Sequence, residues 1–265
     1  MMNEEKRVRL IARFEAEMGK VTRPGTDKLM AYVKQSDFYT APASTRFHLS
    51  CRGGLLQHSL NVLDAMRSVL RYDPMRKCWE YVVAGKVLQT DIPDESVIII
   101  ALLHDICKTY FYTTSIRNVK NRKTGKWEEM PFYTVDDRMP LGHGPKSAMI
   151  IKQYISLTNP ELYAIWHHMG FTGGADDLTF RKAVEEYPLI WATHTADMMA
   201  SSFMEDEREN KPLFREPLQA TAGEWGERLE SGEDNWANPS DANAEPEFEN
   251  ASPIPAQESE GGGNA

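Results

Sequence analysis

Residues 97–108 read VIIIALLHDICK, an apolar run that ends in a histidine and a carboxylate. An ionised aspartate is costly to bury unless a positive charge compensates it. A metal ion is the usual compensation where histidine and aspartate stand together. The pair His104 and Asp105 therefore directs attention to the other histidines and carboxylates that the fold can bring to it.

Two further polar residues lie in apolar segments. His58 falls on the apolar face of a helix predicted over residues 55–71, where a single histidine is usually a hydrogen-bonded core residue. Asp197 is the one charged residue within residues 189–204, so we expect its helix to bury it. On its own, Asp197 would also fit an arginine-paired or capping aspartate. Together with His104 and Asp105, these residues make a mixed nitrogen and oxygen ligand set for a divalent metal.

The ordered set resembles the H…HD…D signature of the HD-domain metal-dependent phosphohydrolase superfamily. The matching segments are GLLQHS at 54–59, LLHDICK at 102–108 and TAD at 195–197, and the resemblance covers roughly residues 45–208. It implies an all-α core in which His58, His104, Asp105 and Asp197 hold one metal ion. This chain has Cys107 where the family commonly has glycine, a departure that leaves the four ligands in place.

Two more segments concern a second ion. LGHG at 141–144 precedes a predicted helix, and IWHHMG at 165–170 ends one. In family members with two metals, histidines in these intervals bind the second ion and the motif aspartate bridges both. The resemblance thus assigns this role to His143 and to one of His167 and His168, since adjacent helical residues point about 100° apart and do not both face one ion. His167 is the preferred one of the pair. The alternatives are a turn residue for His143 and a helix-dipole interaction for the pair.

The resemblance implies hydrolysis of a phosphoester by a metal-activated hydroxide. One or two divalent transition metal ions are expected, and manganese, iron, nickel, cobalt and zinc all suit such ligands. Asp105 would bridge the ions and orient the hydroxide. Lys108, three residues later, is a candidate contact to a substrate phosphate, and a solvated lysine near a helix end is its alternative.

Aromatic and β-branched residues over 110–119 and 126–135 predict a β-hairpin directly after the His–Asp segment. The residues around its turn combine basic and aromatic side chains, which suit a phosphate backbone and stacked bases. An ordinary basic, solvated turn is the alternative. The substrate-binding candidates are Lys120, Arg122 and Lys123.

Elsewhere the hydrophobic periodicity predicts helices. The expected fold class is all-α, an HD-domain helical bundle with the β-hairpin inserted after the His–Asp helix. The expected domains are an N-terminal helical extension over 1–44, a phosphohydrolase domain over 45–215 and an acidic tail over 216–265. Helices are predicted at 3–18, 26–38, 55–71, 75–88, from 94 through the His–Asp pair, and at 144–157, 160–169, 177–187 and 188–207.

The net charge of −9 belongs to the C-terminal tail. Residues 216–265 hold 12 acidic residues and one basic residue, whereas residues 1–215 hold 27 acidic and 29 basic residues. The nearly neutral residues 1–215 thus do not repel an anionic substrate. The tail is expected to be disordered and could bind a protein partner. With no signal peptide, no membrane-spanning run and no paired cysteine spacing, a cytoplasmic location is expected.

The sequence is most similar to bacterial HD-type 3′–5′ exoribonucleases, which carry an N-terminal OB-type domain. The first 40 residues look helical here, so that domain is expected to be absent, and a dNTP triphosphohydrolase or 5′-nucleotidase becomes the alternative. Cyclic-dinucleotide phosphodiesterases fit less well, because FTGG stands at 171–174 where Gly-Tyr-Pro is expected. A non-catalytic module that binds nucleotides or proteins is the alternative of another class. The expected partner is a nucleotide or a short single-stranded nucleic acid.

Overall fold

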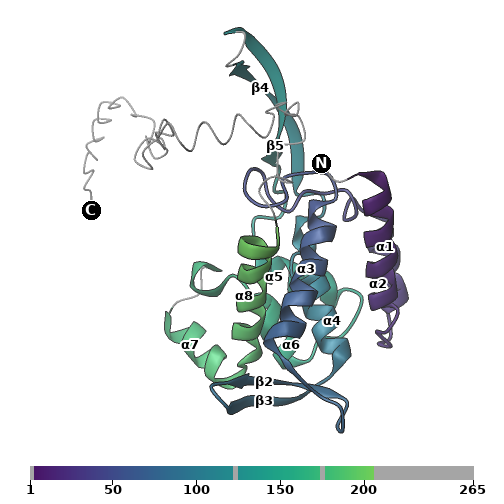
Figure 1. Ribbon diagram of the computed structural model, residues 1–265, viewed down its shortest axis with the longest axis vertical. Helices are drawn as coiled ribbons and strands as arrows, with labels where there is room; N and C mark the ends of the chain where they lie inside the picture. Colours follow the sequence, from purple (N-terminus) through teal and green to yellow (C-terminus); the bar gives the residue numbers. More distant parts are fainter. Residues whose placement is uncertain (1–2, 122–124, 174–176, 206–265) are drawn as a thin grey trace, which may run out of the picture. The chain divides into compact units, whose positions relative to one another are not determined.

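The structure, a computed structural model, describes residues 3–121, 125–173 and 177–205. Within these residues, eight α-helices accompany two small antiparallel sheets, so the expectation of an all-α fold is wrong (Figure 1). The division of the chain into residues 1–44, 45–215 and 216–265 stays a prediction. The acidic tail from residue 216 onward lies outside the described residues.

The main departure from the predicted helices is residues 75–88. They form β2 (Cys78–Val83) and the start of β3 (Lys86–Ile92), which join β1 (Arg71–Asp73) in a sheet of order β1-β2-β3. A turn with positive φ at Ala84 and Gly85, 50° and 80°, connects β2 to β3. Such left-handed turns match the twist of paired strands, and the β-branched and aromatic residues beside this one favour strands over a helix.

Three helices form the centre of the molecule. α3 (Gly54–Val69) packs against α4 (Asp94–Leu103) and α8 (Leu189–Met199), and Figure 1 shows α3 and α8 running side by side. Every residue of α4 from Ser96 to Leu103 is buried. A helix that is apolar on all sides belongs in the interior, so the residues at the end of α4 lie in the middle of the protein.

The remaining helices surround this centre. α1 (Glu4–Met18) packs on α3 and α4, whereas α6 (Asn159–Trp166) packs on α4, α5 and α8. The other elements are α2 (Thr26–Gln35), α5 (His143–Lys152), α7 (Asp177–Glu186), the 3₁₀ turns Ile106–Lys108 and Gly170–Gly173, and a π-helical turn, Ala200–Met204.

A buried carboxylate ties the outer helices to the centre. Glu161, at the start of α6, accepts two hydrogen bonds of 2.5 Å from Arg23 and one of 2.5 Å from Ser96 of α4. It also caps its own helix by accepting from the backbone N–H of Thr158. Burial opposes ionisation, but these donors hold the pKa of Glu161 below its usual value.

The loop before α3 is pressed onto the helix N-terminus. A Cβ at Gly54 would lie 2.0 Å from the carbonyl oxygen of Leu49, so only glycine permits this approach. The Ala43 N–H donates to the Leu49 carbonyl and the Leu55 N–H donates to the Ala41 carbonyl. The loop, which carries His48, is thereby fixed against the helix that carries His58.

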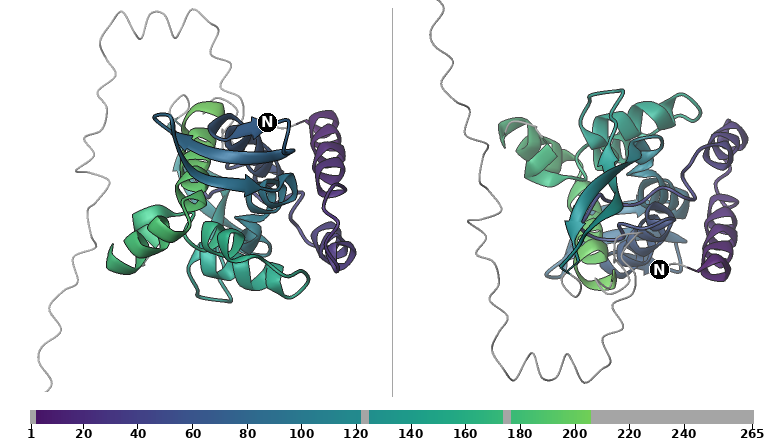
Figure 2. Two further views of the ribbon diagram at one scale, coloured as in Figure 1. Left: turned by 90° about the horizontal axis from the view of Figure 1, so that it is seen from below. Right: turned by 90° about the horizontal axis from the view of Figure 1, so that it is seen from above.

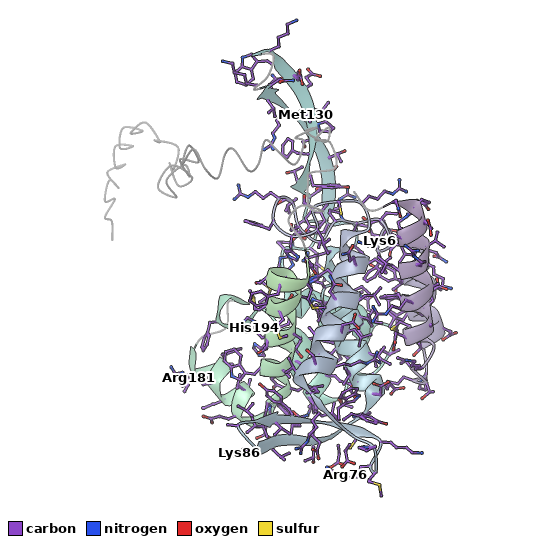
Figure 3. All side chains as sticks on the ribbon, viewed as in Figure 1. Lys6, Arg76, Lys86, Met130, Arg181 and His194 are labelled. Atoms are coloured by element: carbon purple, nitrogen blue, oxygen red, sulfur yellow. The ribbon has the colours of Figure 1, made fainter. Side chains whose placement is uncertain are left out.

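The second sheet is the predicted hairpin, a two-stranded ribbon of β4 (Tyr112–Lys120) and β5 (Trp127–Val135). Its register runs without interruption from Tyr112↔Val135 to Lys120↔Trp127. None of its residues is fully buried. The ribbon extends away from the helices, and its side chains stand clear of them over most of its length (Figures 1 and 3).

The two sheets lie at opposite ends of the helices. The view from below places β2 and β3 in front, whereas the view from above places β4 and β5 in front (Figure 2). Among the described helices, none combines the length and apolarity needed to cross a membrane.

Candidate metal centre

The four residues of the expected metal site meet in the interior. His58 comes from α3, Asp197 from α8, and His104 and Asp105 from the end of α4. His58, His104 and Asp105 are buried, and the side chain of Asp197 is 16 % exposed. The packing of α3 against both α4 and α8 therefore places two imidazoles and two carboxylates together.

The separations of the two imidazoles from each other and from the two carboxylates are close to those that one ion requires. Nε2 of His58 lies 3.3 Å from Nε2 of His104, 3.2 Å from Oδ1 of Asp197 and 3.6 Å from Oδ2 of Asp105. Nε2 of His104 lies 3.5 Å from the same Asp105 oxygen and 4.0 Å from the Asp197 oxygen. Ligands about 2.0–2.2 Å from a tetrahedral ion stand roughly 3.3–3.6 Å apart. The cluster is thus close to the size that a single transition metal ion requires.

Hydrogen bonds at Nδ1 of His104 and His58 determine which ring nitrogen carries the lone pair. Nδ1 of His104 donates to the Ala101 carbonyl at 2.9 Å, and Nδ1 of His58 faces Oε1 of Glu205 at 2.8 Å. In the neutral ring, a proton on Nδ1 leaves Nε2 as a lone pair, and both Nε2 atoms face the cluster. Two lone pairs and two carboxylates have nothing to donate to one another, so the arrangement calls for a cation.

The pKa shifts in the cluster also indicate that it needs a cation. Burial opposes ionisation of Asp105 and Asp197, yet Lys108 holds the pKa of Asp105 well below its usual value and His58 does the same for Asp197. Burial also opposes protonation of His58, but Glu205 and Asp197 raise its pKa to about 10. A proton on His58 and a metal ion are therefore alternative cations for the same place.

His168, and not the preferred His167, faces this cluster. Nε2 of His168 lies 3.7 Å from Oδ1 of Asp105, and Nδ1 faces the Ile165 carbonyl at 2.8 Å. His167 instead stacks on Tyr163 and meets Phe180 edge to face. The buried Nε2 of His168 has no hydrogen-bond partner among the described residues. A buried nitrogen that faces a carboxylate without a hydrogen-bond donor between them has the chemistry of a metal ligand.

His143 lies on another side of Asp105. It begins α5, and its half-buried ring packs against Phe111 at 5.4 Å. Its ligand group is formed with Asp105 and Cys107, whereas His168 groups with His104 and Asp105. The structure thus brings His143 and His168 to the same aspartate but does not place them in one ligand group.

Lys108 is part of the cluster interior. Its ammonium lies 2.6 Å from Oδ2 of Asp105, which it reaches because α4 gives way to a 3₁₀ turn after Asp105. Burial would lower the pKa of Lys108, but the Asp105 carboxylate raises it. A contact between Lys108 and a substrate phosphate stays a prediction and requires that the ammonium turn away from Asp105.

Sequence reasoning missed Glu205. This buried residue, directly after the π-helical turn, accepts from Nδ1 of His48 at 2.5 Å, from Nδ1 of His58 at 2.8 Å and from Asn61 at 3.2 Å. These donors, opposed by burial, lower the pKa of Glu205 to about 2. Glu205 lies eight residues after Asp197, but the π-helical turn between them departs from regular helical spacing, so helical periodicity gave no signal for it.

His194 fixes the segment that carries His168. Its Nδ1 faces the His168 carbonyl at 2.8 Å. Gly170, two residues after His168, has a φ of +61°. A Cβ at this position would lie 2.9 Å from the His194 ring. His194 therefore holds the segment that carries His168, and His48 holds Glu205, which in turn faces His58.

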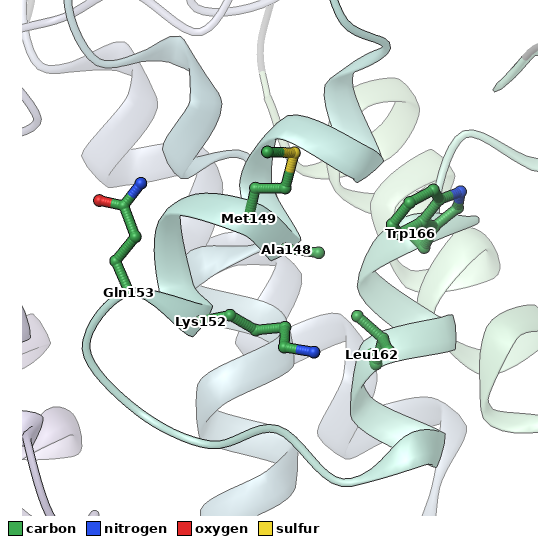
Figure 4. A pocket seen from close by; sticks show the side chains of 6 residues that line it. All are labelled: Ala148, Met149, Lys152, Gln153, Leu162 and Trp166. Atoms are coloured by element: carbon green, nitrogen blue, oxygen red, sulfur yellow. The ribbon is translucent and has the colours of Figure 1, made fainter.

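The substrate-binding candidates lie elsewhere. Lys120 ends β4, exposed, opposite Trp127, while Arg122 and Lys123 lie outside the described residues. A cavity of about 400 Å³ between α5 and α6 contains none of the cluster residues (Figure 4). It is lined by Ala148, Met149, Lys152, Gln153, Leu162 and Trp166.

Comparison of the chain with protein-family models, with curated proteins and with solved structures found no match. The buried His/Asp groups compatible with metal ions are therefore the observation on which a function has to be built.

Proposed function

We propose that this chain is a metal-dependent hydrolase of phosphoesters with an HD-type ligand set. The observation that carries the proposal is the cluster of four ligand atoms at separations suited to one ion, with the unpartnered Nε2 of His168 directed at the other oxygen of Asp105. A purely structural cluster would have its buried lone pairs satisfied by donors. This one directs lone pairs and carboxylates at a common point.

The residues divide between two tasks. His58, His104, Asp105 and Asp197 would hold one ion, and Asp105 with His168 or with His143 would hold another. When bound, such ions lower the pKa of coordinated water and withdraw charge from phosphoryl oxygens. Lys108 pairs with Asp105 and is the buried cation placed to donate to a phosphate oxygen beside the ligands.

The substrate class we propose is a nucleotide or a short single-stranded nucleic acid. The ribbon begins beside the cluster, since Phe111 packs on His143, and it carries Arg117 stacked over Phe132 and an exposed Trp127. These groups suit phosphates and bases. The carboxylates of Glu128 and Glu129 on β5 offset the basic residues, which favours the second candidate, a nucleotidase or dNTP triphosphohydrolase that does not use the ribbon.

The decisive experiment is metal analysis followed by a substrate panel. Protein purified without chelator is expected to contain stoichiometric transition metal. With Mn²⁺, it is expected to hydrolyse at least one member of a panel of dNTPs, nucleoside monophosphates, cyclic dinucleotides and short single-stranded RNA and DNA. Hydrolysis of mononucleotides alone would select the second candidate. Absence of bound metal, together with no hydrolysis after Mn²⁺ or Ni²⁺ is added, would overturn the proposal in favour of a non-catalytic binding module.

A further inference from the structure

Cys107 occupies a place beside the candidate metal centre that the proposed function does not use. Its Sγ lies 3.4 Å from Nδ1 of His143, and Sγ and a ring nitrogen of His143 lie within 4.8 Å of a carboxylate oxygen of Asp105. Asp105 caps the 3₁₀ turn that carries Cys107, and His143 begins α5. The two elements thus meet to form a ligand group that contains sulfur.

The surrounding backbone holds sulfur and nitrogen face to face. The Cys107 N–H donates to Oγ of Ser147 on α5 at 3.2 Å, which links the 3₁₀ turn to the helix that begins with His143. A Cβ at Gly144 would lie 1.9 Å from the Trp166 carbonyl oxygen, so α5 is seated closely on the end of α6. The relative position of Cys107 and His143 is therefore determined by packing and not by their own contact.

We propose that Cys107 is a metal ligand, and that with His143 and Asp105 it forms a second ion position that prefers zinc to manganese or magnesium. A thiolate sulfur about 2.3 Å and an imidazole nitrogen about 2.0 Å from a tetrahedral ion stand roughly 3.5 Å apart. The observed separation of 3.4 Å matches. Soft thiolate ligands select zinc over harder ions, whereas carboxylates alone do not.

The proposal rests on the metal site of the proposed function, because Asp105 belongs to both ligand groups. Binding exchanges the S–H bond of Cys107 for a sulfur–metal bond and releases the proton to solvent, without a change of oxidation state. Two lysines on this side already have carboxylate partners: Lys108 is paired with Asp105 and Lys146 with Asp137.

A simpler arrangement is a hydrogen bond from the Cys107 thiol to the His143 ring. Serine would keep such a bond, since a hydroxyl donates better than a thiol. Serine would not replace a thiolate ligand. Cys107→Ser therefore separates the two arrangements with a change of one atom, and Cys78→Ser, at another buried free cysteine on the β2 strand, is the matched control.

The experiment uses cobalt as the spectroscopic probe and zinc for affinity. The full chain loaded with Co²⁺ is expected to show sulfur-to-cobalt charge-transfer absorption in the near ultraviolet, which Cys107→Ser abolishes and Cys78→Ser retains. Competition with a chelator is expected to show that Cys107→Ser weakens binding of the second zinc at least about tenfold. Thermal melts check that each variant is folded.

Two results would overturn the proposal. One is cobalt bound to the wild-type chain without charge-transfer absorption, a measurement that depends on no variant. The other is absorption that persists in Cys107→Ser. Either result, obtained with one ion bound and hydrolysis intact, leaves the proposed function standing. Failure of the wild-type chain to bind any ion would overturn both.

Discussion

The interior cluster and the β4–β5 ribbon lie next to each other along the chain but are built differently. Around His58 and Asp105, three helices and two loops fix each side chain through backbone hydrogen bonds or a buried carboxylate. The ribbon has a ladder of paired strands and no fully buried residue. Positions that are fixed by packing suit chemistry, which requires preorganised groups, whereas an exposed ribbon suits contact with a partner.

The largest effect is expected from Asp105→Asn, which keeps the size of the side chain and removes its charge. Asp105 belongs to two of the four candidate ligand groups among the described residues, and its carboxylate also faces His58, so hydrolysis should fall by at least about 100-fold and metal binding should weaken. Steady-state kinetics and metal analysis measure both. The control is Asp91→Asn on β3, where the side chain is 68 % exposed and the change should be silent. Retained turnover in Asp105→Asn would defeat the proposed mechanism.

The two adjacent histidines offer a second test. His168→Ala removes the unpartnered nitrogen that faces Asp105, so hydrolysis should fall at least about tenfold, and the loss of a buried ring that meets His104 edge to face should also lower the free energy of unfolding. His167→Ala should keep hydrolysis but lower the free energy of unfolding by about 1–2 kcal/mol, because its ring packs on Tyr163 and Phe180. Kinetics and chemical denaturation report the two effects, and the reverse pattern would show that His167 is the ligand.

A third test concerns Glu205. Glu205→Gln keeps an acceptor for Nδ1 of His58 but removes the charge that orients it, so zinc affinity should fall about 10- to 100-fold. A titration against a competing chelator measures the affinity. Glu128→Gln removes a carboxylate from the ribbon and should leave affinity unchanged. Equal affinities in both variants would mean that Glu205 has no part in holding the site.

The smallest effect is expected on the ribbon. Replacing the cross-strand pair Lys120 and Trp127 by alanine should lower the free energy of unfolding by at most about 1 kcal/mol. Hydrolysis of mononucleotides should be unchanged, while binding of short single-stranded RNA or DNA should weaken several-fold, because stacking contributes about 1–3 kcal/mol per base. Fluorescence anisotropy with labelled oligonucleotides measures binding. Unchanged binding would assign the ribbon to a role other than substrate contact.

The sequence was informative where apolar context isolates a polar residue. Asp197 stands alone in an apolar helix and His58 on an apolar face, and the structure brings both to His104 and Asp105. The position of the ribbon was likewise evident from its β-branched and aromatic residues. In these cases the local sequence pattern and the tertiary packing favour the same position for each residue.

The errors come from places where a regular helix does not continue. α6 ends at Trp166, and His167 has φ of −108° and ψ of 16°, so the angular spacing of helical residues does not decide between the two histidines. Residues 75–88 have helical spacing in part, but the left-handed turn at Ala84 and Gly85 closes a β-hairpin there. Glu205 follows a π-helical turn, whose wider spacing no periodicity captures.

That π-helical turn also determines how short a working version of this protein can be. A chain ended at Met204 would keep α8 and all four ligands of the first ion. It would lack the carboxylate that receives the outer protons of His58 and His48. A truncation designed from the described helices alone would therefore remove a side chain that holds His58 and His48 in position.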